Sequence, residues 1–283
     1  MQNLIDADTL STLLDDPATV VLDASWYLPA DGRDPEAEFA AAHIPLARRF
    51  DFDGKVKDQA SGLPHMLPRA EEFQDAAQAL GILQDSRIVV YDGAGVFAAP
   101  RAWWMFKAMC HTAVCVLDGG LPAWRAAGKP VESGPEVPPA ARGDFVARPD
   151  PLWIRNAEGV RYALDGAETV VDARSAARFE GAQDEPRPGL RSGHMPGARN
   201  LPFDRLIESG RYRDPQSIRD AYRVAGIEPG SPIVATCGSG VTAAVLALGA
   251  QVAGLGPVAV YDGSWSEWGQ ETRSDLPVVK GPA

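Results

Sequence analysis

The chain has 283 residues, of which 45% are hydrophobic and 23% are charged, and its formal net charge is −11. At roughly 100–200 residues per domain this length predicts two domains with separate cores, and the ordinary composition excludes a mostly disordered chain. The negative charge repels phosphate backbones and no basic patch is visible, so we expect no nucleic-acid partner.

The N-terminal segment 1–16 carries acids where a secretory signal would need a basic start and an apolar run. No stretch approaches the roughly 18 uninterrupted apolar residues of a membrane helix. The cysteines, Cys110, Cys115 and Cys237, form an odd and sparse set that fits a reducing compartment better than a disulfide scaffold. We therefore expect a cytoplasmic protein that does not bind a membrane.

Several segments of the first half of the chain recur, in the same order, in the second half. The matches pair 20–24 with 170–174, 43–45 with 194–196, 87–92 with 232–237, and 116–119 with 260–263. The offset stays between about 144 and 151 residues, which is far longer than one unit of a solenoid. It therefore predicts two whole domains with the same fold.

Each copy alternates short β-branched strands with helical stretches such as 70–80 and 218–225. This alternation is typical of a parallel sheet flanked by helices, so we predict an α/β fold for both halves. Between the copies, residues 128–151 are rich in proline, glycine and alanine, which resist regular structure. The predicted organisation is a first domain at 1–130, a linker at 131–150 and a second domain at 151–283.

Cys237 follows a predicted strand, 233–236, and precedes a glycine-bearing loop that opens into a predicted helix, 242–253. In this order, backbone N–H groups of the loop and the positive end of the helix both point toward the cysteine. Such an anion cradle lowers the pKa of a thiol from its usual value of about 8.5 and makes the nucleophilic thiolate available. The same cradle would hold a persulfide anion, so we predict that Cys237 is a reactive nucleophile.

Most single cysteines at strand ends are small buried hydrophobes, and we assign Cys110 and Cys115 to that class because no glycine loop stands beside them. Asp92 occupies the position of Cys237 in the first copy, so we expect the first domain to be catalytically silent. Cysteine phosphatases share the order of strand, cysteine, loop and helix. They need an arginine directly after the loop to hold phosphate, however, and this chain has Ala243 there.

Longer segments carry a family resemblance, and they are 23–29, 65–68, 99–106, 117–120, 185–187, 193–197, 237–242 and 261–265. On these segments the chain resembles the tandem rhodanese family, and within it the 3-mercaptopyruvate sulfurtransferase branch, over nearly its whole length. The resemblance implies two rhodanese-like domains, of which the second is catalytic. It further implies that sulfur passes from 3-mercaptopyruvate through a persulfide on Cys237 to a thiol acceptor or cyanide, releasing pyruvate, without a metal or cofactor.

The loop after Cys237 bears on the choice of donor. Thiosulfate-using members of the family typically carry basic residues there, whereas Gly238 and Ser239 are neutral and match the mercaptopyruvate branch. Two alternatives stay open: a thiosulfate sulfurtransferase, and a non-catalytic rhodanese-like module that binds a partner or relays sulfur. Thioredoxin or another thiol is the acceptor that the resemblance implies.

The resemblance also assigns roles to individual side chains. Arg178 and Arg187 map onto the two arginines that bind the carboxylate of the donor. The loop residues expected to contact the donor are Gly238, Gly240, Val241 and Thr242.

A proton relay is implied for Ser239, His43 and Asp34, in which an imidazole oriented by a carboxylate manages a proton as the C–S bond breaks. His43 has a structural alternative, a local cap before Pro45. Its counterpart in the second copy, His194, is expected to be structural.

Overall fold

The computed structural model describes residues 2–228 and 230–282. The chain separates into two compact units. The first unit comprises Met1–Gln59, Leu67–Asp150 and Ser209–Tyr212, and the second comprises Ala60–Met66, Pro151–Glu208 and Arg213–Ala283. Each half of the chain therefore contributes one short segment to the unit built mainly from the other half.

Within the described residues, each unit is built around a five-stranded parallel sheet. In spatial order, the first sheet contains β1 (Leu4–Ile5), β5 (Val114–Leu117), β4 (Arg87–Tyr91), β2 (Thr19–Asp23) and β3 (Arg48–Arg49). The second contains β6 (Ile154–Arg155), β12 (Ala259–Tyr261), β11 (Ile233–Thr236), β7 (Thr169–Asp172) and β8 (Arg199–Asn200). The two sheets have the same order of corresponding strands, as the duplication predicted. A small sheet pairs β9 (Ile207–Glu208) with β10 (Arg211–Tyr212).

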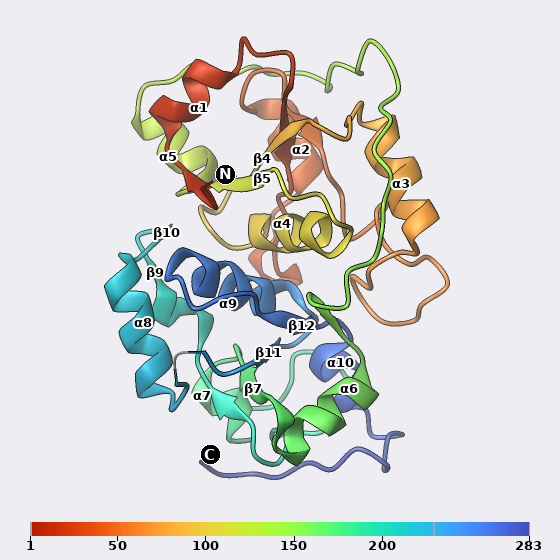
Figure 1. Cartoon of the computed structure of the whole chain (residues 1–283), viewed down its shortest axis with the longest axis vertical. Helices are drawn as coiled ribbons and strands as arrows, with labels where there is room; N and C mark the ends of the chain where they lie inside the picture. The colour runs from red at the N-terminus through yellow and green to blue at the C-terminus, as the bar shows by residue number, and fades with distance from the viewer. Residues whose placement is uncertain (1, 229, 283) are drawn as a thin grey trace. The chain divides into compact units, whose positions relative to one another are not determined.

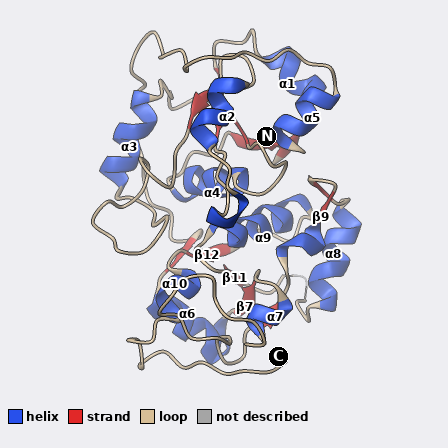
Figure 2. Cartoon of the chain, turned by 180° about the vertical axis from the view of Figure 1, so that it is seen from behind, coloured by secondary structure: helices blue, strands red, loops and turns tan. Residues whose placement is uncertain are grey.

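Helices flank both sheets (Figures 1 and 2). The first unit contains α1 (Ala7–Leu13), η1 (Pro29–Asp31), α2 (Pro35–Ala41), α3 (Ala70–Ala79), α4 (Ala99–Ala108) and α5 (Gly120–Ala126). The second contains α6 (Ala157–Tyr162), the π-helical turn η2 (Ala163–Ala167), α7 (Ala176–Phe179), η3 (Phe203–Leu206), α8 (Pro215–Val224), α9 (Val241–Val252) and α10 (Ser264–Trp268). The predicted α/β class is confirmed. None of the described helices combines the length and the apolarity that crossing a bilayer requires.

The predicted helix ends are close to the observed ones, and the differences have local causes. Helix α8 begins at Pro215 rather than at residue 218, because the carboxylate of Asp214 accepts hydrogen bonds from the N–H groups of Gln216 and Ser217. Proline at the first helical position needs no such partner, so this sequence starts a helix well. Helix α9 begins one residue earlier than predicted, at Val241.

Two apolar helices lie on the central strands and fix the cores. In α9 the residues from Ala243 to Ala250 are all buried, and it packs on β11 and β12 (Figure 1). Helix α4 is buried from Ala99 to Phe106 and packs on β4 and β5. The apolar side chains of these helices are stabilised by burial, although α4 also buries the charged side chain of Arg101. The N-termini of these two helices are therefore held firmly at the ends of β11 and β4.

Residues 131–150 contain no helix and no named strand, in line with their composition, but they pack on the first unit. Glu132 exchanges backbone hydrogen bonds with His43, and Phe145 is fully buried with its ring 6.3 Å from that of Phe73. Glu136 accepts a hydrogen bond from the N–H of Arg49. This segment thus connects the two repeats in sequence while it completes the first unit in space.

Candidate active site

Cys237 lies directly after β11, and Gly240 is the N-cap residue of α9. The N–H of Gly240 donates a hydrogen bond to Sγ of Cys237 at 3.2 Å. Gly240 has φ of 81°, a left-handed conformation that glycine adopts without steric cost. One amide of the predicted cradle therefore points at the sulfur, and the Cys237 residue is only 2% exposed.

The backbone on either side of the sulfur is held by the start of α10. The N–H of Cys237 donates to Oγ of Ser264 at 3.2 Å, and this hydroxyl donates to the carbonyl of Tyr261 at 2.8 Å. The N–H of Trp265 donates to the carbonyl of Cys237 at 2.9 Å. Both polar groups of the cysteine backbone are thus satisfied, which fixes the direction of its side chain.

Gly238 follows Cys237 and lies next to the side chains of Ser266 and Arg178. Its carbonyl accepts hydrogen bonds from both the N–H and the hydroxyl of Ser266, at 2.9 and 2.7 Å. A Cβ atom at Gly238 would lie 3.1 Å from Nη2 of Arg178. The guanidinium of Arg178 is therefore beside the loop that carries Cys237, and glycine leaves it room.

Arg178 is the outer member of a chain of ion pairs that starts at the end of β7. Asp172 binds Arg174 at 2.7 Å, and Arg174 binds Glu185 at 2.7 Å. Glu185 in turn binds Arg178 at 2.5 Å. The side chains of Asp172, Arg174 and Glu185 are at most 1% exposed, whereas that of Arg178 is 23% exposed. The carboxylates raise the pKa of Arg174 even though burial alone would lower it, so the buried cation stays charged.

Arg187 is half-buried and, among the described residues, makes no hydrogen bond or ion pair. It lines a cavity of about 280 Å³ in the second unit, together with residues 62–64, Ser266 and Gln270. Ser266 also binds the carbonyl of Gly238, so the cavity adjoins the loop that carries Cys237. An uncompensated guanidinium in such a place is suited to bind an anion.

The other predicted loop residues lie in the same turn. Ser239 is 6% exposed, and its hydroxyl makes no hydrogen bond within the described part of the chain. Val241 is buried and Thr242 is partly exposed, at the first turn of α9. The structure therefore brings together Cys237, Ser239 and Arg178 with the loop, while contacts of Gly238, Val241 and Thr242 with a donor stay predictions.

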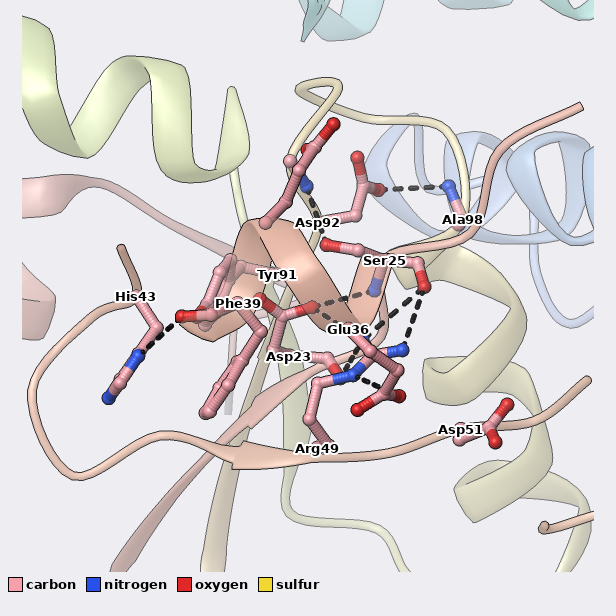
Figure 3. A network of polar contacts seen from close by, with 12 residues as sticks. Asp23, Ser25, Glu36, Phe39, His43, Arg49, Asp51, Tyr91, Asp92 and Ala98 are labelled. Carbon is pink, nitrogen blue, oxygen red and sulfur yellow. Dashed lines mark hydrogen bonds and ion pairs between the residues drawn. The ribbon is translucent and has the colours of Figure 1, made fainter. Parts of the chain in front are cut away.

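The first unit has a comparable loop after β4, and its amides bind the carboxylate of Asp92. Asp92 follows β4 and is completely buried, and its carboxylate accepts hydrogen bonds from the N–H groups of Ala94, Phe97, Ala98 and Ala99 at 2.8–3.0 Å. Figure 3 shows the contact with Ala98. Burial raises the pKa of Asp92, while these amides oppose the shift. The first unit thus carries a carboxyl group where the second unit carries a thiol.

The two loops differ in length, which the sequence match does not show. Helix α4 begins at Ala99 with Ala98 as its N-cap, so the loop after Asp92 is longer than the loop after Cys237. The same repeat offset pairs Gly95 with Gly240 in the sequence, but Gly95 lies inside the loop before α4 and is not its N-cap residue. Only Gly240 occupies the N-cap.

His43 and Asp34, predicted for the proton relay, belong to the first unit. Nδ1 of His43 lies 2.8 Å from the carbonyl of Phe39, and its ring stacks on Phe39 at 4.0 Å (Figure 3). Nε2 of His43 lies 3.9 Å from Glu132. The carboxylate of Asp34 caps α2 by accepting from the N–H groups of Glu36 and Ala37. In the described structure Asp34 makes no hydrogen bond or ion pair with His43.

His194 has the same surroundings in the second unit. Its Nδ1 lies 2.9 Å from the carbonyl of Phe179, and the two rings stack at 3.8 Å. This parallel favours the structural alternative for His43, since both histidines fasten the chain after a helix. The catalytic roles of His43 and Asp34 stay predictions.

The prediction for Cys115 is confirmed and that for Cys110 is wrong. Cys115 is buried in β5, and burial raises the pKa of its thiol to about 12. Cys110 is exposed, because α4 ends at Ala108 and the chain turns outward there with φ of 63° at the cysteine.

Sequence reasoning assigned no role to Glu185, Ser264 or Ser266. The first two lie in segments that carry the family resemblance, but only their contacts show what they do. One sequence signal was present, because Ser264 aligns with Gly120 of the first copy. In the structure both residues have positive φ.

Comparisons with known proteins agree with this geometry. The family model of the Rhodanese-like domain matches residues 6–127 and 157–271. The 3-mercaptopyruvate sulfurtransferase of Rattus norvegicus is 43% identical over 265 residues, which cover 92% of this chain and 88% of the relative. The thiosulfate sulfurtransferase of Gallus gallus is 43% identical over 252 residues, covering 88% and 85%. The crystal structure of the 3-mercaptopyruvate sulfotransferase SseA from Escherichia coli superimposes with a TM-score of 0.84 and 37% identity, covering 94% of this chain and 100% of the other.

Proposed function

Because this chain belongs to the rhodanese family, we propose that it is a sulfurtransferase that takes sulfur from 3-mercaptopyruvate onto Cys237. The observation that carries the proposal is the hydrogen bond from the N–H of Gly240 to the sulfur, with Arg178 beside the same loop. The first unit, where Asp92 fills the cradle, takes no part in sulfur chemistry.

In the first half-reaction the thiolate of Cys237 attacks the sulfur of mercaptopyruvate. The carbon–sulfur bond breaks, and its electron pair leaves with pyruvate enolate. The enolate takes up a proton, in balance with the proton that the thiol of the donor loses, and becomes pyruvate. The sulfur stays on the enzyme as a persulfide. The amide of Gly240 favours the negative charge on the sulfur before attack and on the persulfide after it.

In the second half-reaction an acceptor attacks the outer sulfur and leaves the thiolate of Cys237. A protein thiol such as thioredoxin becomes a persulfide, and cyanide becomes thiocyanate. All three cysteines of the chain are free, which is consistent with the reducing cytoplasm that we propose as its location.

The carboxylate of the donor is assigned to the two arginines. Arg187 has no internal partner, whereas Arg178 already shares its charge with Glu185. We therefore assign the main carboxylate contact to Arg187 and a secondary contact to Arg178. The hydroxyl of Ser239, which has no partner among the described residues, is assigned to the proton that the enolate receives.

The neutral side chains after the cysteine favour mercaptopyruvate over thiosulfate, which carries two negative charges and would need more cations in the loop. The thiosulfate sulfurtransferase among the relatives makes thiosulfate the alternative donor. A direct test compares pyruvate release from mercaptopyruvate with thiocyanate formation from thiosulfate, at equal enzyme and cyanide concentrations. A clear preference for thiosulfate would refute the donor assignment.

Intact-mass spectrometry tests the covalent step. After incubation with mercaptopyruvate and removal of the excess, the protein should gain the mass of one sulfur atom, and Cys237→Ser should gain none. The matched control is Cys110→Ser, which removes an exposed thiol and should keep the gain. Absence of the added sulfur with either donor would favour the non-catalytic binding module.

A further inference from the structure

The first unit has its own cavity at the position that corresponds to the active-site loop. It measures about 410 Å³ and is lined by Arg33, Glu38, Ala41, Ala42, Gly93, Leu121, Pro122 and Arg125. Gly93 follows Asp92 as Gly238 follows Cys237. The N–H of Leu121 donates to the carbonyl of Asp92 at 3.0 Å, as the N–H of Trp265 does to that of Cys237.

An arginine–glutamate pair stands beside the glycine in both units, but the member of the pair that the helix carries differs. In the second unit Arg178 precedes Phe179 on α7, and Glu185 comes from the following loop. In the first unit the glutamate, Glu38, precedes the corresponding Phe39, and Arg33 comes from the loop before α2. The helix thus supplies the glutamate in the first unit and the arginine in the second, and the pair adjoins the glycine in both.

In the first unit, hydrogen bonds fix the orientation of the side chains of Arg33 and Glu38. Arg33 binds Glu38 through Nε and Nη2, at 2.7 and 2.6 Å, and its Nη2 also donates to the carbonyl of Gly93 at 3.3 Å. The hydroxyl of Tyr27 donates to the same carboxylate at 2.7 Å. Hydrogen bonds from Arg33 and Tyr27 hold the pKa of Glu38 below its usual value, so its charge is present and already compensated.

Each unit adds a second arginine without an internal partner. In the second unit this is Arg187, and in the first it is Arg125 on α5. Over the described residues, neither Arg125 nor Nη1 of Arg33 makes a hydrogen bond or ion pair. The lining therefore offers free guanidinium N–H groups and a net positive charge, on a chain whose overall charge is −11.

We propose that this cavity of the first unit binds a small organic carboxylate and does not convert it. Arg125 and Nη1 of Arg33 bind the carboxylate, and the apolar wall of Ala41, Ala42, Leu121 and Pro122 accommodates a short carbon body. Sulfur transfer is excluded in this cavity because Asp92 occupies the position that Cys237 has in the second unit. The parallel with the second unit is structural, so the inference does not depend on turnover at Cys237.

Residue-resolved protection of arginines tests the proposal on the full chain carrying Cys237→Ser, in which no sulfur is transferred. Phenylglyoxal modification is followed by peptide mass spectrometry with pyruvate as the probe. At a pyruvate concentration about ten times Kd, modification of Arg125 and Arg33 should slow about ten-fold. Arg69, whose side chain is 76% exposed and which lies outside the cavity, should react at an unchanged rate. Equal rates for Arg125 with and without pyruvate would overturn the proposal.

Variants separate this site from the active site. Arg125→Gln should abolish the protection of Arg33, and in the chain that keeps Cys237 it should leave sulfur transfer unchanged. Arg223→Gln, a matched change of an exposed arginine on α8, should keep the protection. Arg187→Gln should leave the protection of Arg125 intact; its loss there would assign the effect to the active site and refute a second site. Protection by sulfate as strong as that by pyruvate would refute the preference for an organic carboxylate.

Discussion

Glu185 binds Arg178 from a fully buried position, with Oε2 of the carboxylate 2.5 Å from Nη2 of the guanidinium. The same carboxylate binds Arg174, which is locked onto Asp172 at the end of β7. The position of Arg178 beside the Cys237 loop is therefore set by an ionic chain that begins in the central sheet. This relationship makes Glu185 a positioning residue for the proposed donor site.

Glu185→Gln should raise KM for mercaptopyruvate more than it lowers kcat, because Arg178 keeps its charge but loses its anchor. Breaking a buried ion pair should also lower the free energy of unfolding by about 3–5 kcal/mol. Steady-state kinetics and urea denaturation measure the two effects. The double variant Arg178→Gln/Glu185→Gln should be no less active than Arg178→Gln alone, since Glu185 acts through Arg178.

The control for this prediction is Glu168→Gln. Glu168 binds Arg155 at 2.6 Å in the same unit, at a partly buried site without contact to the loop. Loss of this ion pair should lower the free energy of unfolding and leave KM for mercaptopyruvate unchanged. An additive loss of activity in the double variant would contradict the positioning role.

Arg187→Gln should lower kcat/KM for mercaptopyruvate by about 10- to 150-fold, because a hydrogen bond to a charged group contributes about 1.5–3 kcal/mol. Stability should change little, since Arg187 has no partner among the described residues. The effect should appear mainly in KM. Arg205→Gln, which removes an exposed arginine of the same unit, serves as the control, and an equal loss of activity there would argue against a specific carboxylate contact.

The three thiols should react with iodoacetamide according to their surroundings. Burial raises the pKa of Cys115 to about 12, so below that pH the protonated thiol dominates, and at pH 8 only about 1 in 10,000 molecules carries the thiolate there. Cys115 should stay unlabelled up to about pH 9 in the folded protein, as mapped by peptide mass spectrometry. In a Cys110→Ser background, labelling of Cys237 should abolish pyruvate release. Rapid labelling of Cys115 would contradict its burial.

Ser264→Ala should destabilise the protein by about 1–3 kcal/mol, because the buried N–H of Cys237 loses its acceptor. Ser264→Gly loses the same hydroxyl but relieves the left-handed backbone, which has φ of 48°. It should therefore be the more stable of the two by about 1 kcal/mol. Denaturation midpoints of the two variants and the wild type measure both effects, and a more stable alanine variant would show that the backbone is not strained there.

The ion pairs at the strand ends show where sequence reasoning stops. In the first unit Asp23 is paired with Arg49 from β3 at 2.8 Å (Figure 3), whereas in the second Asp172 is paired with Arg174, two residues further along the chain. The repeat offset aligns Arg49 with Asn200. It therefore does not predict that Arg174 pairs with Asp172 as Arg49 pairs with Asp23. Charge pairing between elements depends on spatial neighbours, which no linear pattern reports.

The sequence alone determined the duplication and the α/β class, and it singled out Cys237 as the predicted nucleophile and Asp92 as its counterpart in the first copy. These follow from local patterns: buried strands, glycine loops and a thiol or carboxylate at a strand end. Tertiary structure alone decided that Cys110 is exposed, that Asp34 caps a helix without touching His43, and that Glu185 orients Arg178. The physical reason is that side-chain partners are selected by distance in space, and folding brings them together from positions that the sequence keeps apart.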